Sequence, residues 1–176
     1  MRYWTCHWQN RYWTADSNDE GEPLTASGSN MFRKRGVAPG DSIYVLSLRG
    51  GVLLLGGRMT VGDIVSRDEA VRRTGNDNLY DASEWVLAAK GSGTKLDLFR
   101  EISPEVARDL RFVSATGKPK GLFFETPTQL DVQATRGVRE LTRESAHLLD
   151  RILKITDSMP RSLATRQVTR LMLSIG

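Results

Sequence analysis

The sequence predicts an α+β fold in which a barrel or sandwich of β-strands is flanked by short helices and followed by a C-terminal amphipathic helix. Two observations favour this class. Pairs of glycines join consecutive β-prone segments, which indicates neighbouring antiparallel strands rather than βαβ units. Helix-start signals open only short segments until residue 142, after which apolar residues follow helical spacing.

The first forty residues are expected to form one strand and one brief helix. Tyr3–Trp8 is β-prone, and a polar loop rich in Asp, Glu, Asn and Gly follows at 15–25. The small polar residues 27–30 can cap a helix start. The turn Pro39-Gly40-Asp41 then ends that helix within about two turns.

Two glycine pairs organise the middle of the chain. Ser42–Leu48 alternates and carries β-branched residues, so it predicts a strand. Gly50-Gly51 makes a tight hairpin into a second strand at 52–55. Gly56-Gly57 is expected to bend the chain before a third strand at 58–65.

Capping signals locate the later helices. Ser66 with Glu69 three residues on fits a capping box, which predicts a helix to about Arg73. Ser103-Pro104-Glu105 puts proline in the first turn of another helix and an acid at the positive end of its dipole. The longest helix is expected from Thr142. Further strands are expected at 83–89, 122–125 and 137–141.

The totals suit one domain. The chain has 176 residues, of which 39% are hydrophobic and 26% charged, close to a soluble average. Its longest apolar run, 52–55, is too short to cross a membrane, and no signal peptide is evident. The single cysteine, Cys6, excludes an intramolecular disulfide and a cysteine-based zinc site, so a cytoplasmic setting is expected. Lys and Arg exceed Asp and Glu by 25 − 21 = 4, which fits an ordinary surface or a nucleic-acid partner equally.

Four stretches, 27–41, 43–46, 57–61 and 133–142, together resemble EVE domains of the PUA-like group, relatives of ASCH and YTH domains. In that family a Tyr-Trp strand precedes an Asn-containing loop, and a Gly-Asp turn leads into the next strand. The resemblance implies a PUA-like mixed β-barrel at 1–156, with 157–176 as a C-terminal helical extension. Ala26-Ser27-Gly28 stands where the family has Trp-Asp-Gly, so Trp8 or Trp13 is expected to replace that pocket tryptophan.

The resemblance also implies a reader of nucleic acid that accommodates a flipped, modified base. DNA is favoured over RNA, and modified cytosine over other bases. No enzymatic activity, cofactor, metal or membrane is expected, and any cleavage is assigned to a partner nuclease. The oligomeric state is left open.

We expect a base-binding pocket made of Trp4, Trp8, Ser27, Ser29, Asn30, Trp85 and Gln133. An aromatic ring stacked on a base contributes roughly 1–3 kcal/mol, comparable to the few kcal/mol that extrusion from a duplex costs. Short hydroxyl and amide groups can read a base edge. The alternatives are core packing for the tryptophans, helix capping for the serines and asparagine, and a polar turn for the glutamine.

The nucleic-acid backbone is expected to contact Arg33, Lys34, Arg35 and Arg136. Such contacts position the strand without specifying its sequence, and they weaken with salt. A solvated run of charges is the alternative.

Two rival functions stay open. One is a regulatory protein that binds a nucleoside or another small molecule in the same pocket. The other is a hydrolase or nuclease, for which the sequence offers few parts. His7 and His147 are far apart, and Cys6 and His7 point to opposite faces of a strand, so they cannot form a nucleophile pair.

Overall fold

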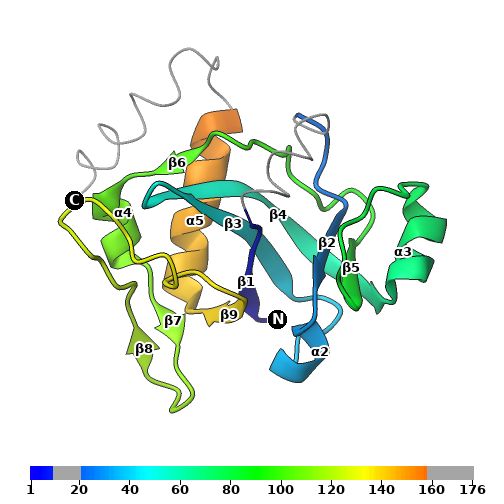
Figure 1. The fold of residues 1–176 in the computed structure, drawn as a ribbon, viewed down its shortest axis with the longest axis horizontal. Coiled ribbons are helices and arrows are strands. Elements are labelled where there is room, and N and C mark those ends of the chain that lie inside the picture. The colour runs from blue at the N-terminus through cyan, green and yellow to red at the C-terminus, as the bar shows by residue number, and fades with distance from the viewer. Residues whose placement is uncertain (10–20, 158–176) are drawn as a thin grey trace.

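The computed structural model describes residues 1–9 and 21–157 (Figure 1). Trp13 and nearly all of the expected C-terminal extension, 157–176, therefore lie outside the described residues. In chain order the elements are β1 (Tyr3–His7), β2 (Ala26–Ser29), α2 (Phe32–Arg35), β3 (Ser42–Arg49), β4 (Val52–Val65), α3 (Arg67–Thr74), β5 (Glu84–Ala88), β6 (Glu101–Ile102), α4 (Pro104–Asp109), β7 (Phe112–Val113), β8 (Pro119–Lys120), β9 (Val138–Leu141) and α5 (Arg143–Asp157).

The strands form one nine-stranded mixed sheet in the order β2-β5-β4-β3-β1-β9-β7-β8, with β6 added to β4. β1 runs parallel to β3 and antiparallel to β9. The α+β class is therefore confirmed. Within the described residues the end strands β2 and β8 each pair on one side only, so the sheet is open and the expected barrel is not confirmed.

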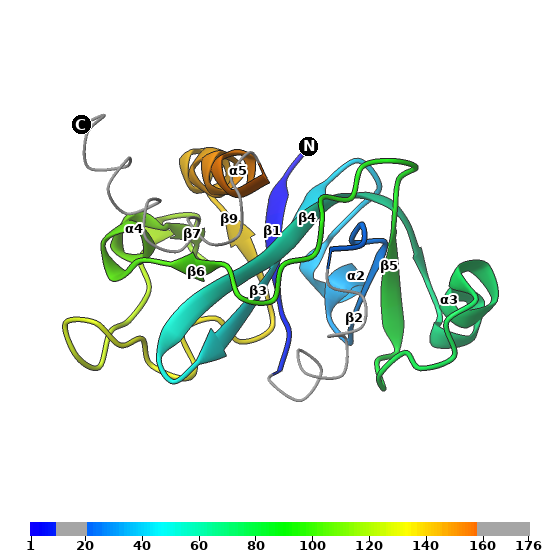
Figure 2. The ribbon, with the colours of Figure 1, turned by 90° about the horizontal axis from the view of Figure 1, so that it is seen from above.

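β4 is a single strand of 14 residues, so the expectation of two strands separated by a glycine bend was wrong. The pairing with β3 passes from Val45–Gly57 to Leu46–Leu55 and leaves Gly56 as an extra residue. Such a bulge absorbs one residue without ending the strand. As a result β4 runs from the α4 end of the molecule to the α3 end (Figure 2).

Three of the four predicted helix starts are confirmed, since α5 also begins directly after Thr142, as expected. Ser66 accepts a hydrogen bond from the Glu69 backbone N–H, and Ser103 caps α4 in the same way. α2 differs, because it begins after Met31 without a side-chain cap, while residues 26–29 form β2. The expected strand at 122–125 was also wrong, since only an isolated bridge between Phe124 and Leu130 forms there.

Two large hydrophobic clusters occupy opposite faces of the sheet's centre, as side-chain alternation along β3 requires. α5 covers one of them, packing Leu149 and Ile152 against Tyr44 and Leu46. The other contains the indoles of Trp4 and Trp8 together with Phe32 of α2. A smaller cluster joins α3 to β5. No helix in the described part of the chain is both long and apolar enough to cross a membrane.

Candidate nucleic-acid interface

The three described candidate tryptophans are core residues. Trp4, Trp8 and Trp85 are 2%, 4% and 2% exposed. The Trp4 Nε1–H donates to the Asp41 carboxylate at 2.9 Å, and the Trp8 Nε1–H donates to Ser27 Oγ at 2.9 Å. The Trp85 Nε1 atom is buried without a hydrogen-bond partner. None of the three rings is displayed on the surface.

A cavity of about 940 Å³ opens beside Asn30, and we call it the Asn30 pocket. Residues from distant parts of the chain line it, among them His7, Ser29, Asn30, Tyr80, Gln129 and Arg136. The hairpin glycines 50 and 51 also lie on its wall. The pocket therefore gathers three of the predicted site residues, namely Ser29, Asn30 and Arg136.

Hydrogen bonds to the backbone hold the polar wall of the Asn30 pocket in place. Asn30 Oδ1 accepts from the Ser83 N–H at 2.7 Å, and Ser29 Oγ accepts from the Met31 N–H at 3.2 Å. These bonds orient both side chains before any ligand arrives, which lowers the entropy cost of binding.

His7 adds a second polar group to the wall of the Asn30 pocket, and the buried Thr135 lies beside it. His7 Nδ1 and Thr135 Oγ1 lie 3.0 Å apart. Burial, and secondly the charge of Arg136, lower the pKa of the His7 imidazole, so the ring is neutral at pH 7. A neutral imidazole offers one donor and one acceptor. The neighbouring Cys6 is inert by comparison, because burial raises the pKa of its thiol to about 11.

Tyr80 separates the Asn30 pocket from the two indoles. Its ring lies 4.7 Å from that of Trp85 and 6.4 Å, edge-on, from that of Trp8. Its hydroxyl accepts from the Gly28 N–H at 2.8 Å and donates to the Gly28 carbonyl at 2.7 Å. Tyr80 lines the Asn30 pocket on one side and a cavity of about 320 Å³, shared with Trp8 and Trp85, on the other.

Gly28 is required by this packing. A Cβ at this position would lie 2.8 Å from Trp85 Cε2 and 2.9 Å from the Ala82 Cβ, closer than real contacts allow. The absence of a side chain therefore lets the indole of Trp85 pack directly against β2.

A second hollow, of about 690 Å³, borders the first at Arg136. Four basic side chains line it, namely Arg35, Lys120, Arg136 and Arg139, and we call it the cationic groove. Trp4, Gln133 and the exposed ring of Phe123 also line it. Two carboxylates, Asp131 and Glu140, leave the lining with a net charge of 4 − 2 = +2. Four of the predicted site residues thus meet here: Trp4, Arg35, Gln133 and Arg136.

No carboxylate among the described residues pairs with a cation of the cationic groove. Within the described residues none of the four forms an ion pair. Arg139 donates to the Ala134 carbonyl, and its guanidinium lies 3.9 Å from the centre of the Phe112 ring. Burial, and secondly the charge of Arg35, lower the pKa of Arg139.

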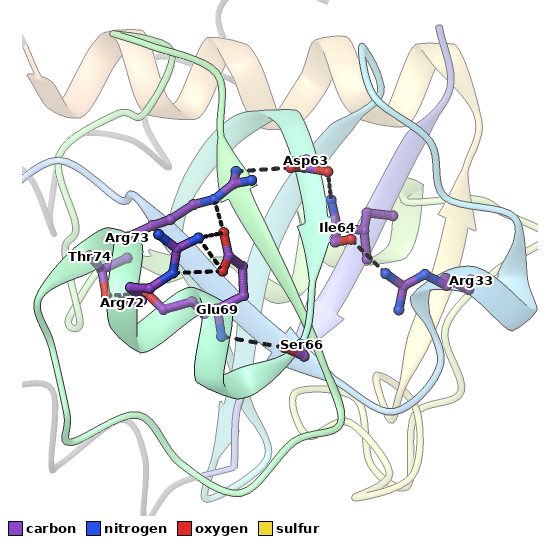
Figure 3. A network of polar contacts seen from close by, with 9 residues as sticks. Arg33, Asp63, Ile64, Ser66, Glu69, Arg72, Arg73 and Thr74 are labelled. Atoms are coloured by element: carbon purple, nitrogen blue, oxygen red, sulfur yellow. Dashed lines mark hydrogen bonds and ion pairs between the residues drawn. The ribbon is translucent and has the colours of Figure 1, made fainter.

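The three residues of the predicted basic run, Arg33, Lys34 and Arg35, do not lie at one site. Arg33 pairs with Glu84 at 3.7 Å and donates to the Ile64 carbonyl at 2.6 Å (Figure 3). Lys34 is exposed and lines neither hollow, whereas Arg35 reaches the cationic groove. Because α2 is a single short turn, its successive side chains point in different directions.

Sequence reasoning missed Tyr80, Lys120, Phe123 and Arg139. Tyr80 is a lone aromatic in a polar stretch, and its role depends on a contact 52 residues away in sequence. Arg139 lies in the predicted late strand, where alternation alone does not say which face meets α2.

No family model matches the chain, and no curated protein matches it.

Proposed function

We propose that this chain is a non-enzymatic reader of nucleic acid, a PUA-like domain of the EVE type, which holds one base in the Asn30 pocket and the flanking backbone in the cationic groove. The observation that supports this most is the position of Arg136, which lines both hollows. A base and the phosphate next to it are only a few ångströms apart, so a reader needs adjoining sites of this kind.

The chemistry of the Asn30 pocket suits a base edge. The Asn30 Nδ2 group can donate to a base edge, and the Nε2 atom of the neutral His7 imidazole offers a second contact, while Asn30 Oδ1 and His7 Nδ1 contact Ser83 and Thr135. The half-buried ring of Tyr80 adds an aromatic wall. The volume of the pocket leaves room for a substituent on the base, so a modified base such as modified cytosine can be accommodated.

The chemistry of the cationic groove suits phosphate. Unpaired guanidiniums bind phosphate oxygens with strong, charge-assisted hydrogen bonds and need not first break an ion pair. Such contacts are indifferent to sequence, so selectivity is assigned to the Asn30 pocket.

The test is a set of binding titrations with labelled DNA and RNA oligonucleotides, with and without modified cytosine or adenine, at several salt concentrations. Asn30→Ala is expected to reduce the preference for the modified base. Thr116→Ala, an exposed polar residue that lines neither the Asn30 pocket nor the cavity beside Trp85, is the control. Failure of every oligonucleotide to bind at moderate salt would overturn the proposal, and binding that ignores modification would overturn its modified-base part.

One observation favours a second candidate, the binding of a free nucleoside or similar small molecule. The cavity of about 320 Å³ is lined by the rings of Trp8, Tyr80 and Trp85, and small-molecule sites begin near this size. Binding there would be insensitive to salt and to Arg136→Ala. Calorimetry with modified nucleosides separates this function from the reader.

A further inference from the structure

Phe123 is an exposed aromatic ring at the edge of the cationic groove. Its side chain is 67% exposed, and it lines the same hollow as Arg35, Lys120, Arg136 and Arg139. A single exposed apolar side chain is ordinary in itself. Its place among unpaired cations is what distinguishes this one.

The backbone around Phe123 is fixed. The Asp131 N–H donates to the Phe123 carbonyl at 3.1 Å, and Phe124 bridges Leu130 in antiparallel fashion. Phe124 packs against the core beneath the guanidinium of Arg108, 4.6 Å from its ring centre. Because side chains alternate along extended backbone, anchoring Phe124 inward turns Phe123 outward. The ring is therefore presented from a held segment.

The lining combines the two features that single-strand sites share. Cations track the phosphates of the strand, and aromatic faces stack on its bases. In a duplex both faces of each base are covered by neighbours, so a projecting ring such as Phe123 gains a stacking partner only where a base is unstacked. An acidic peptide would pair with the cations but would provide no base to stack on the Phe123 ring.

We propose that the cationic groove binds a single-stranded segment of nucleic acid and that Phe123 stacks on a base flanking the one held in the Asn30 pocket. This inference rests on the proposed function and sharpens it, because it assigns presentation of the target base to a single strand rather than to an intact duplex.

The test compares a labelled single-stranded oligonucleotide with its own duplex, by anisotropy at fixed salt. The wild type is expected to bind the single strand more tightly. Phe123→Ala is expected to weaken single-strand binding roughly tenfold, as loss of one stacked base implies, and to leave duplex binding unchanged. Phe123→Leu should lose nearly as much, whereas Phe123→Trp should retain affinity, because stacking needs a ring.

Phe99→Ala is the matched control, since Phe99 is 58% exposed and lies outside the cationic groove, with Arg49 above its ring at 5.8 Å. It is expected to bind like the wild type. If Phe123→Ala binds the single strand as tightly as Phe99→Ala does, or if the duplex binds more tightly than the single strand, this inference is wrong while the proposed reader function is unaffected. If no oligonucleotide binds, the proposed function falls. Binding of poly-glutamate as tight as that of the single strand would overturn the nucleic-acid assignment itself.

Discussion

The α3 region and the cationic groove differ in whether their arginines form ion pairs. Beside α3, Arg72 and Arg73 both contact Glu69 at 2.6 Å, and Arg73 also contacts Asp63 at 2.9 Å (Figure 3). In the cationic groove four basic side chains line one hollow, and none forms an ion pair within the described residues. Both regions gather basic side chains, and they differ in whether those side chains pair with carboxylates.

The comparison teaches that a count of basic residues does not locate an anion site. A paired guanidinium presents little net field, whereas an unpaired one adjoining a hollow attracts anions. The basic run 33–35 makes the point within three residues, because Glu84 neutralises Arg33 while Arg35 lines the groove. The following predictions exploit this contrast.

The largest effect is expected from reversing the charge at the junction of the two hollows. Arg136→Glu should weaken oligonucleotide binding roughly 100-fold, because it removes one phosphate contact and adds repulsion. Arg72→Glu is the control, since it reverses the same charge in the α3 region, and only a small loss is expected. Equal losses in anisotropy titrations would contradict the distinction between the two regions.

The next effect concerns salt. If all four groove cations contact phosphates of a single strand, log K should fall against log salt with a slope of roughly −3, since each contact contributes about −0.7. Arg35→Ala should make the slope less steep by about 0.7. A slope near zero in the wild type would show that the groove does not bind phosphate.

A smaller effect is expected from removing the carboxylate that pairs with the arginines of the α3 region. Hydrogen bonds from Arg72 and Arg73 lower the pKa of Glu69, so its carboxylate stays ionised through the neutral range. Glu69→Gln removes that charge and should give the α3 region weak, salt-sensitive affinity for any oligonucleotide, roughly twofold above background. Glu105→Gln, another exposed acid in a first helical turn, should leave non-specific binding unchanged.

The smallest effect is a pH dependence of stability. Burial lowers the pKa of folded His7 below the unfolded value of 6.5, so the unfolded chain takes up a proton first as the pH falls. The free energy of unfolding should therefore decrease as the pH drops below about 6.5. His7→Gln should flatten this slope in denaturant titrations between pH 5 and 8.

Structural features that depend only on neighbouring residues were predicted correctly from the sequence. The Ser66 N-cap, the proline start of α4 and the hairpin at Gly50-Gly51 are each decided by neighbours in the chain, and each forms as predicted. Where a rule depends on a partner strand, prediction fails. Gly56 could have been a bend, and only the continuous pairing of β3 and β5 with β4 makes it a bulge.

The structure brings together only some of the residues predicted for the site, because their contacts depend on distant parts of the chain. Ser29 and Asn30, both predicted for the base pocket, line the Asn30 pocket, and Arg136, predicted for the nucleic-acid backbone, lines it as well, whereas Gln133 lies in the cationic groove. Trp8 and Trp85 line a different cavity, because the ring of Tyr80 lies against them. Nothing in the local sequence reports a contact between residues 28 and 80, so the wall of the pocket could not be assigned in advance.

That contact between Tyr80 and Gly28 has a consequence for association. β2 is the last strand on its side of the sheet, and such a strand exposes backbone groups that can recruit the strand of another molecule. The phenol occupies both the amide and the carbonyl of Gly28, so no second chain can continue the ladder there. The Tyr80 hydroxyl thus occupies both backbone groups of Gly28, and Tyr80→Phe would leave them without that partner.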